Sequence, residues 1–474
     1  MKDSVEYLYK KTTGCEPSEV LTLGAHGSNR RYWRVKGDGG QYIAAYNEDV
    51  RENEAFFYYS SSLLQRGVHV PKVYAISDDR KCYLQQDLGD TTLYMYLLDK
   101  QRNGGGFDTE MLALYKRVLD DLAAMQVLGR DMDFSHAYPR SDFDAQSIQW
   151  DLNYFKYYFL KLRYVPFDEE LLERDFHTLI AYLLDADCGF FMYRDFQSRN
   201  VMLVDGVPYY IDFQGGRRGA AQYDVASLLY SAKSNLPEPI RQELLQHYVR
   251  SFSEHYKIDK DDFLQRFYGY VLIRIMQAMG AYGFRGYYER KDYFLSSIPL
   301  AINNLRIIIE SHPLPIEIPH LMQALLYLAN SEEGAGQQPI EEGLVVTVNS
   351  FSYKKGLPRD TSGNGGGYVF DCRALPNPGR YPEYRCYTGK DRPVIDFLQG
   401  DEAVEGFLVA AEQMVGASVK KYLERKFTSL TVSFGCTGGQ HRSVYCAERL
   451  AKWLSENFNC QVVVNHVEQQ WKNT

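Results

Sequence analysis

Two short stretches near the start of the chain show alternating side chains. They are Tyr32 to Val35 and Tyr42 to Tyr46, and they flank the turn-forming sequence GDGG at Gly37 to Gly40. A period of two is typical of β-strands, and a glycine-rich turn between two such stretches is typical of a hairpin. We therefore predict a small antiparallel sheet over the residues up to about Gln86.

From about Leu93 to Asn330 the apolar side chains recur instead at the three- and four-residue spacing of an amphipathic helix. Two examples are the set Leu122, Met125 and Leu128 and the set Leu152, Phe155, Phe159 and Leu162. This spacing predicts a second, mostly helical lobe.

One region interrupts the helical pattern. Phe190 to Tyr193 and Val201 to Val204 are short apolar runs, and Gly206 marks a turn before Tyr209 to Phe213. Short apolar runs bounded by turn residues are typical of buried strands. We expect β-structure embedded among the helices here.

The best linker candidate is Ser331 to Glu342, because this stretch combines Gly, Pro, Gln and acidic residues without apolar periodicity. After it, the strand-like sequences VVTV, VFDCR and SLTVSFG and the helical sequence RSVYCAERLAKWL predict a modest α/β domain. The expected organisation is a sheet-containing lobe over residues 1–88, a helical lobe over residues 89–330, a linker over residues 331–342 and a separate domain over residues 343–474.

Composition agrees with several folded units. The chain has 474 residues, of which 45% are hydrophobic, and this length exceeds what one hydrophobic core normally serves. Eight cysteines without any Cys-x-x-Cys pair suit a reducing compartment. The amino terminus has no apolar signal segment, and no run of about 18 to 20 apolar residues occurs, so we expect a cytoplasmic protein.

The sequence Tyr193 to Asn200, followed by Ile211-Asp212-Phe213, carries the candidate chemistry. Phosphoryl transfer to a hydroxyl group needs a carboxylate that accepts the hydroxyl proton, and Asp195 suits this task as the catalytic residue. Oxygen ligands must hold a magnesium ion on the ATP phosphates, and Asn200 and Asp212 supply an amide and a carboxylate oxygen. This joint pattern, unlike a lone Asp-x-x-x-x-Asn, predicts a kinase site over residues 193–213.

Two upstream segments are candidates for nucleotide binding. Glycines let backbone amides approach phosphate closely, and polar side chains beside them add donors. The candidate residues are Gly24, Gly27, Ser28, Asn29 and Arg31 in the glycine-rich segment, with Gln85 and Gln86 at the predicted hinge between the lobes. A plain hairpin turn is the alternative reading of the glycine-rich segment.

The stretches SNRRYWRV, LQQDLGD, MYRDFQSRN, YYIDFQ and QYDVASLL resemble the aminoglycoside phosphotransferase and choline kinase superfamily. Within it, they are most similar to the anomeric kinases of N-acetylmuramate and N-acetylglucosamine (AmgK). The resemblance covers about residues 1 to 330. It implies an α+β protein-kinase-like two-lobed fold, ATP and Mg²⁺ as cofactors, and phosphorylation of an amino sugar during cell-wall recycling.

The third strand departs from the kinase pattern. Protein kinases carry a phosphate-binding lysine there, but this chain reads Tyr42-Ile43-Ala44-Ala45-Tyr46. The nearest basic residues are Arg30, Arg31 and Arg34, and an arginine fork binds phosphate oxygens. Exposed charges on an edge strand are the alternative reading of these arginines.

A second glycine-rich turn lies between the strand that ends at Phe434 and the helix that begins near Ser443. Unpaired amides and the positive end of the helix dipole favour an anion there. The predicted anion-binding residues are Cys436, Thr437, Gly438, Gly439, His441, Arg442 and Ser443. The same letters satisfy the Cys-x-x-x-x-x-Arg-Ser cradle of cysteine phosphatases, so a nucleophilic Cys436 is the alternative.

The sequences SFSYKKGLP, FDCRALPNPG, YTGKDRPV and GCTGGQHRSVYCAERLA resemble the carboxy-terminal domain of the RNase adapter protein RapZ. This resemblance implies binding of an amino-sugar phosphate or of small RNA. Residues from Leu344 onward hold 16 Lys and Arg against 13 Asp and Glu, a small surplus for RNA phosphates. We therefore expect a sugar-phosphate ligand rather than RNA.

The leading hypothesis is an amino-sugar kinase joined to a domain that binds a sugar phosphate. One alternative keeps the kinase but gives it choline, an aminoglycoside or another small alcohol as acceptor. The other is a non-catalytic kinase-like scaffold attached to an RNA-binding domain. No membrane partner is expected, since the sequence has no membrane-spanning segment.

Overall fold

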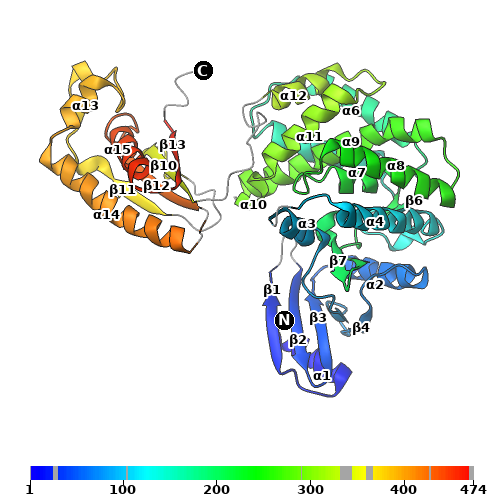
Figure 1. The fold of residues 1–474 in the computed structure, drawn as a ribbon. Helices are drawn as coiled ribbons and strands as arrows, with labels where there is room; N and C mark the ends of the chain where they lie inside the picture. The colour runs from blue at the N-terminus through cyan, green and yellow to red at the C-terminus, as the bar shows by residue number, and fades with distance from the viewer. Residues whose placement is uncertain are drawn as a thin grey trace. The chain divides into compact units, whose positions relative to one another are not determined.

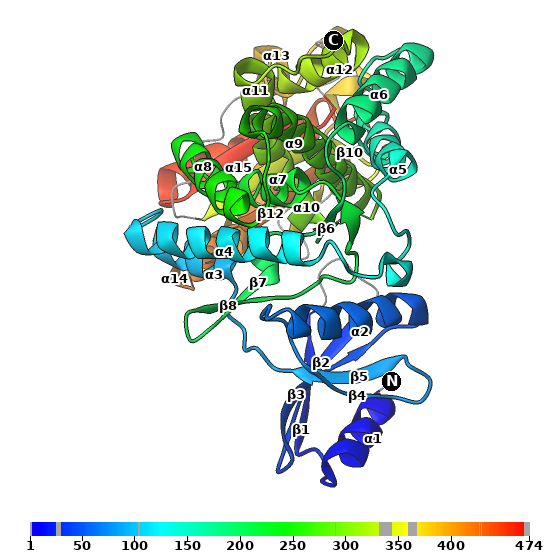
Figure 2. The same ribbon diagram turned by 90° about the vertical axis from the view of Figure 1, so that its right-hand side faces the viewer.

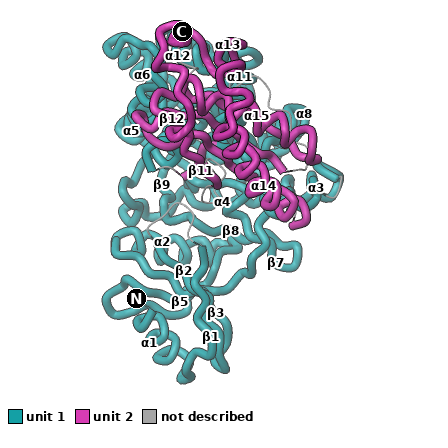
Figure 3. Tube along the Cα trace, turned by 90° about the vertical axis from the view of Figure 1, so that its left-hand side faces the viewer, with its two compact units in different colours: residues 1–289, 296–336 teal, residues 290–295, 337–474 magenta. Residues whose placement is uncertain are grey.

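The computed structural model describes residues 2–24, 30–102, 105–289, 291–330, 344–358, 367–425, 427 and 429–468. It divides into two compact units, one of residues 1–289 and 296–336 and the other of residues 290–295 and 337–474 (Figure 3). The predicted linker, Ser331 to Glu342, lies outside the described residues.

The first unit begins with a five-stranded antiparallel sheet in the order β1-β2-β3-β5-β4. The strands are β1 (Glu19–Leu23), β2 (Arg31–Gly37), β3 (Gly40–Tyr46), β4 (Val73–Ile76) and β5 (Cys82–Gln86). The predicted hairpin is confirmed, because Gly37 pairs with Gly40 at the turn between β2 and β3. Side chains from one face, including Trp33, Val35 and Ala44, form a core with helix α1 (Lys2–Thr13).

The prediction of strands and turns up to Gln86 was incomplete. This region also contains α1 and a longer helix, α2 (Val50–Gln65), which lies between the sheet and the helical lobe (Figure 2). The side chain of Asp49 begins α2 by accepting a hydrogen bond from the amide of Arg51. The apolar side chains of α2 recur at helical spacing and are buried along one face.

The helical lobe follows, as predicted (Figure 1). Its α-helices are α3 (Leu93–Arg102), α4 (Thr109–Leu128), α5 (Ala145–Phe155), α6 (Glu169–Leu184), α7 (Gln222–Leu229), α8 (Glu238–His255), α9 (Lys260–Tyr282), α11 (Ile298–Ser311) and α12 (Pro319–Ala329). Aspartate caps begin four of them, at Asp108, Asp144, Asp168 and Asp259. Among the described residues no helix combines the length and the apolar character needed to cross a membrane.

One predicted apolar face is only partly buried. Leu152, Phe155 and Phe159 are buried, but Leu162 is exposed. Helix α5 continues into the wider π-helical turn η2 (Lys156–Leu160), which ends before Leu162, so the regular spacing no longer applies. The exposure of Leu128 has a similar reason, because this residue is the last of α4.

The β-structure predicted among the helices is confirmed. Strand β6 (Phe190–Met192) pairs with β9 (Arg217–Gly219), and β7 (Val201–Val204) pairs with β8 (Val207–Tyr210) in an antiparallel hairpin. The loop between β6 and β7 includes the short 3-10 turn η3 (Ser198–Asn200). These strands position the predicted kinase residues.

The second unit contains a parallel sheet in the order β11-β12-β10-β13. Its elements are α10 (Asp292–Leu295), β10 (Val345–Ser352), β11 (Tyr368–Asp371), α13 (Arg392–Leu398), α14 (Glu402–Glu424), β12 (Ser429–Cys436), α15 (Arg442–Asn457) and β13 (Gln461–His466). Strand β13 was not predicted. The α/β class is confirmed, and a core of buried residues joins the sheet to α14 and α15.

Candidate active site

The backbone before Asp195 has an unusual conformation that buried partners hold in place. Arg194 has a φ of 83°, a left-handed value that side chains other than glycine rarely adopt. The fully buried carboxylate of Asp224 accepts hydrogen bonds from the amide of Tyr193 at 2.7 Å and from the amide of Arg194 at 2.9 Å. Asp224 thus fixes the start of the loop between β6 and β7, residues 193–200, which is the predicted catalytic loop.

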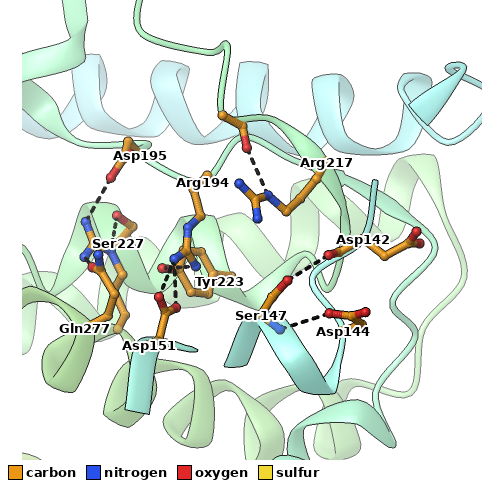
Figure 4. A network of polar contacts seen from close by, with 12 residues as sticks. Asp142, Asp144, Ser147, Asp151, Arg194, Asp195, Arg217, Tyr223, Ser227 and Gln277 are labelled. Atoms are coloured by element: carbon orange, nitrogen blue, oxygen red, sulfur yellow. Dashed lines mark hydrogen bonds and ion pairs between the residues drawn. The ribbon is translucent and has the colours of Figure 1, made fainter. Parts of the chain in front are cut away.

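The side chain of Arg194 fixes the loop a second time. Its guanidinium donates to both carboxylate oxygens of Asp151 on α5, at 2.7 and 2.8 Å, and to the hydroxyl of Tyr223 on α7 at 2.8 Å (Figure 4). These bonds connect the loop to two helices of the lobe. A non-glycine residue keeps a left-handed backbone conformation only where surrounding contacts hold it there. Such strained residues are common next to functional residues.

Asp195 itself remains accessible, with 44% of its side chain exposed. Within the described residues, its carboxylate contacts Arg274 of α9, whose guanidinium lies 3.4 Å from one oxygen. Arg274 is held in turn by the hydroxyl of Ser227 at 2.9 Å and by Gln277. An exposed carboxylate next to an oriented cation is suited to accept a proton from a bound hydroxyl group.

Asn200 and Asp212 lie together beside Asp195. The side-chain amide of Asn200 donates to the backbone oxygen of Asp195 at 2.9 Å and to a carboxylate oxygen of Asp212 at 3.2 Å. Asp212 follows β8 rather than lying on it, and its φ of 72° turns it out of the strand direction. The other carboxylate oxygen accepts from Gln214 at 2.9 Å.

The oxygen chemistry of Asn200 and Asp212 fits a magnesium ion. Magnesium is usually bound by one or two protein carboxylates together with substrate phosphates, so a cage of protein ligands is not required. No group of three or more His, Cys, Asp or Glu residues that could hold a metal ion occurs in the described part of the chain. These two residues would hold the ion where it also meets the phosphates of a nucleotide.

The pKa of the Asp212 carboxyl group is raised by its surroundings. Burial among protein atoms raises the pKa of its carboxyl group, and the nearby charge of Asp195 raises it further. Gln214, Arg199 and Arg30 act in the opposite direction. The side chain nevertheless keeps contact with solvent, which leaves it open to a cation.

The predicted nucleotide-binding residues of the sheet are placed in part. Gly24 follows β1, Arg31 begins β2, and both are exposed. Gln85 and Gln86 end β5, where they pair with Ile43 and Tyr42 of β3. Gly27, Ser28 and Asn29 lie outside the described residues.

A pocket next to Asp195 was not predicted. Its lining includes Gln197, Ser227, Tyr230, Arg274 and Asn304. Gln197 and Ser227 belong to the stretches MYRDFQSRN and QYDVASLL, but no sequence motif included Tyr230, Arg274 or Asn304. Only the tertiary structure identifies these three residues.

In the second unit, the loop after β12 folds around its own cysteine. The sulfur of Cys436 lies 3.1 Å from the hydroxyl oxygen of Ser443 and accepts a hydrogen bond from the amide of Gly439 at 3.2 Å. Burial raises the pKa of this thiol, but the bonds from Ser443 and from the amides of Ser443, Gly439 and Gly438 outweigh it, so the pKa is lowered overall.

His441 and Arg442 both contact backbone oxygens of a segment earlier in the chain. A ring nitrogen of His441 lies 3.0 Å from the carbonyl oxygen of Tyr384. The buried guanidinium of Arg442 donates to the carbonyl oxygens of Arg373 at 2.8 Å and Leu375 at 3.0 Å. Thr437 and Gly438 are the exposed members of the predicted set.

Comparison with known sequences separates the same two parts of the chain. Residues 344–470 match the RapZ C-terminal domain. Nucleotide-binding proteins of Chromobacterium violaceum and Acidithiobacillus ferrooxidans are 42% identical over 123 residues and 43% identical over 126 residues. These matches cover 26% and 27% of this chain and 41% and 40% of the relatives. The chain therefore spans about two fifths of the length of these curated relatives.

Solved structures similar to the first part include kinases of small alcohols. Ethanolamine kinase of Plasmodium vivax is 12% identical with a TM-score of 0.47, and the match covers 62% of this chain and 84% of that one. Choline kinase of Cryptosporidium parvum is 11% identical with a TM-score of 0.45, covering 69% and 100%.

The family itself is shown by the match of the sequence. Residues 19–258, just over half of the chain, match the phosphotransferase enzyme family, and this range includes the sheet, the catalytic loop and both predicted metal ligands. The predicted resemblance to the phosphotransferases is thereby confirmed, as is the resemblance to the RapZ C-terminal domain. This chain belongs to the phosphotransferase enzyme family.

Proposed function

We propose that the first unit is an ATP- and Mg²⁺-dependent kinase that phosphorylates a hydroxyl group of an amino sugar, such as the anomeric hydroxyl of N-acetylmuramate or N-acetylglucosamine. The observation that carries this proposal is the convergence of Asp195, Asn200 and Asp212, linked by hydrogen bonds of 2.9 and 3.2 Å. A proton acceptor thereby lies next to two oxygen ligands. This is the minimum that phosphoryl transfer from ATP requires.

Asp195 acts as the proton acceptor in this mechanism. The acceptor hydroxyl oxygen forms a bond to the γ-phosphorus of ATP, while the bond from that phosphorus to the β,γ-bridging oxygen breaks. The hydroxyl proton passes to the carboxylate of Asp195, and ADP leaves. Arg274, 3.4 Å from that carboxylate, keeps it oriented. Bound magnesium supplies charge neutralisation on the phosphates, and Asn200 and Asp212 are the residues that would hold it.

The pocket beside Asp195 supports a sugar as the acceptor. Gln197 brings an amide group to this pocket, whereas Ser227, Tyr230 and Asn304 already bond to Arg274, Glu238 and Arg241. An amide group, which both donates and accepts, suits a ligand with several hydroxyl groups. Arg274 is the only charged residue among its described lining. A cationic acceptor such as choline would meet this positive charge, whereas a neutral or anionic sugar would not be repelled.

A screen of acceptors tests this proposal. ADP formation by the full chain is measured with N-acetylmuramate, N-acetylglucosamine, choline, ethanolamine and an aminoglycoside, each with Mg²⁺ and with excess chelator. We expect turnover with an amino sugar, its loss on chelation and its return when Mg²⁺ is restored. Turnover with choline or ethanolamine alone would contradict the amino-sugar assignment, and no turnover with any acceptor would contradict the kinase assignment as tested.

The second unit is proposed to bind a sugar phosphate at the loop between β12 and α15. Thr437 and Gly438 are exposed where α15 begins, and the first amides and the dipole of a helix favour an anion. Cys436 serves this loop as an acceptor for Gly439 and Ser443, and the engaged guanidinium of Arg442 speaks against a phosphatase cradle. A phosphorylated sugar would link this unit to the product of the kinase.

A further inference from the structure

The position of the missing phosphate-binding lysine can be located on β3. Ala44 belongs to the core that faces α1, so the next residue, Ala45, faces the opposite side of the sheet. Ala45 is fully buried and lies opposite Tyr32 of β2 and Tyr83 of β5. A methyl group occupies less of this face of the sheet than the lysine side chain of protein kinases would.

Arg30 lies on this side of the sheet, directly before β2. Its guanidinium forms an ion pair of 3.1 Å with Glu52 in the first turn of α2, and only 2% of its side chain is exposed. It also lies over the ring of Phe56, one helical turn further along α2, with 5.8 Å between the guanidinium carbon and the ring centroid. Arg30 therefore joins the sheet to the helix that faces the helical lobe.

Helix α2 connects this ion pair to the metal ligand. The ring of Phe56 stacks on the ring of Phe213, with centroids 4.9 Å apart and planes 7° from parallel. Phe213 directly follows Asp212 in the chain. Arg30 is thus linked to the segment that carries Asp212 by its contact with the Phe56 ring and by the stacking of Phe56 on Phe213.

The other two arginines considered from the sequence have different surroundings. Arg34 is held by Asp87 at 2.6 Å and by Asp90 at 2.8 Å, beside the hinge. Arg31 is exposed at the first position of β2. Of the three, only Arg30 is buried with a glutamate partner on α2 and contacts Phe56, the ring that stacks on Phe213 beside Asp212.

We propose that Arg30, paired with Glu52, is the residue that binds the nucleotide phosphates in place of the absent third-strand lysine. This inference rests on the proposed kinase function. A guanidinium presents several N–H donors in a fixed plane, so one edge can pair with Glu52 while another binds a phosphate oxygen. The small side chain of Ala45 makes this approach from the neighbouring strand possible.

The affinities of the full chain for ATP, ADP and adenosine test this role. Loss of a phosphate contact weakens the binding of ATP and ADP but not that of adenosine, which has no phosphate. The dissociation constants of ATP, ADP and adenosine are measured by calorimetry for wild type, Arg30→Gln, Arg30→Lys and the control Arg174→Gln on the exposed face of α6. We expect Arg30→Gln to weaken ATP and ADP by about 10- to 100-fold, the loss of one charge-assisted hydrogen bond. Adenosine binding should remain unchanged, and Arg174→Gln should bind all three like wild type.

A rescue variant separates charge from packing. Lysine at position 45 restores the usual arrangement, so Arg30→Gln combined with Ala45→Lys should recover part of the lost ATP affinity. If Arg30→Gln does not fold, Arg30→Lys carries the test, with several-fold weaker ATP binding and unchanged adenosine binding expected. Equal losses for ATP and adenosine, or unchanged ATP binding in both Arg30 variants, would contradict the proposal. A wild-type chain that binds no ATP would instead contradict the kinase function itself.

Discussion

Asp224 is a carboxylate whose protonation should be visible in the stability of the fold. Burial raises its pKa to about 7, although the amides of Tyr193 and Arg194 and the side chain of Gln126 lower it in part. The folded protein therefore binds this proton more tightly than the unfolded chain does. The stabilisation is complete below the ordinary pKa of an aspartate, about 4, and is lost as pH rises to about 7.

Replacing Asp224 by asparagine removes this titration. Denaturant unfolding is measured between pH 5 and 8 for wild type, Asp224→Asn and Asp205→Asn, the last in the exposed turn between β7 and β8. We expect the stability of wild type relative to Asp224→Asn to fall as pH rises towards 7 and then to level off, since each unit of raised pKa is worth about 1.4 kcal/mol. Parallel curves for these two proteins would contradict a raised pKa at Asp224, and Asp205→Asn should follow wild type.

Individual site residues could be predicted from the sequence where the chemistry is local. Asp195, Asn200 and Asp212 lie within 18 positions of one another on a loop and a hairpin, so their spacing already predicts proximity. Arg274 and Glu52 could not be found in this way. Their contacts to Asp195 and Arg30 depend on the packing of α9 and α2, which no local pattern specifies.

The loop between β12 and α15 can be tested as one element. Calorimetry of the full chain with N-acetylglucosamine 1-phosphate, and with N-acetylglucosamine as the unphosphorylated control, measures its proposed ligand. Thr437→Val removes an exposed hydroxyl donor, and we expect about tenfold or greater weakening of the phosphorylated sugar with unchanged kinase turnover. Equal affinity in wild type and variant would contradict binding at this loop.

At the level of elements, the sequence predicted strands better than the helices that accompany them. Alternation located β2 and β3, and short apolar runs located β6, β7 and β8. Helix α1 was overlooked, although Val5, Leu8 and Tyr9 have helical spacing and form its buried face. Strand β13 presents mostly exposed or half-buried side chains, so its hydrophobic pattern is too weak to stand out from a loop.

The whole molecule consists of two units with separate cores, and each unit contains a different candidate site. The catalytic loop is braced by α5 and α7 of the first unit, and the loop at Cys436 is formed by β12 and α15 of the second. Each part matches a different family. The linker between them lies outside the described residues, so the domain limits at residues 331–342 stay a prediction.

Asp195 is proposed to remove the proton of the acceptor hydroxyl in a site whose nucleotide is bound by other residues. The most direct measurement compares phosphoryl transfer and ATP affinity in wild type, Asp195→Asn and the control Asp205→Asn. We predict that Asp195→Asn loses about 100- to 10,000-fold in turnover while its ATP affinity is unchanged, and that Asp205→Asn matches wild type. Turnover by Asp195→Asn equal to that of wild type would contradict the role of Asp195 as proton acceptor.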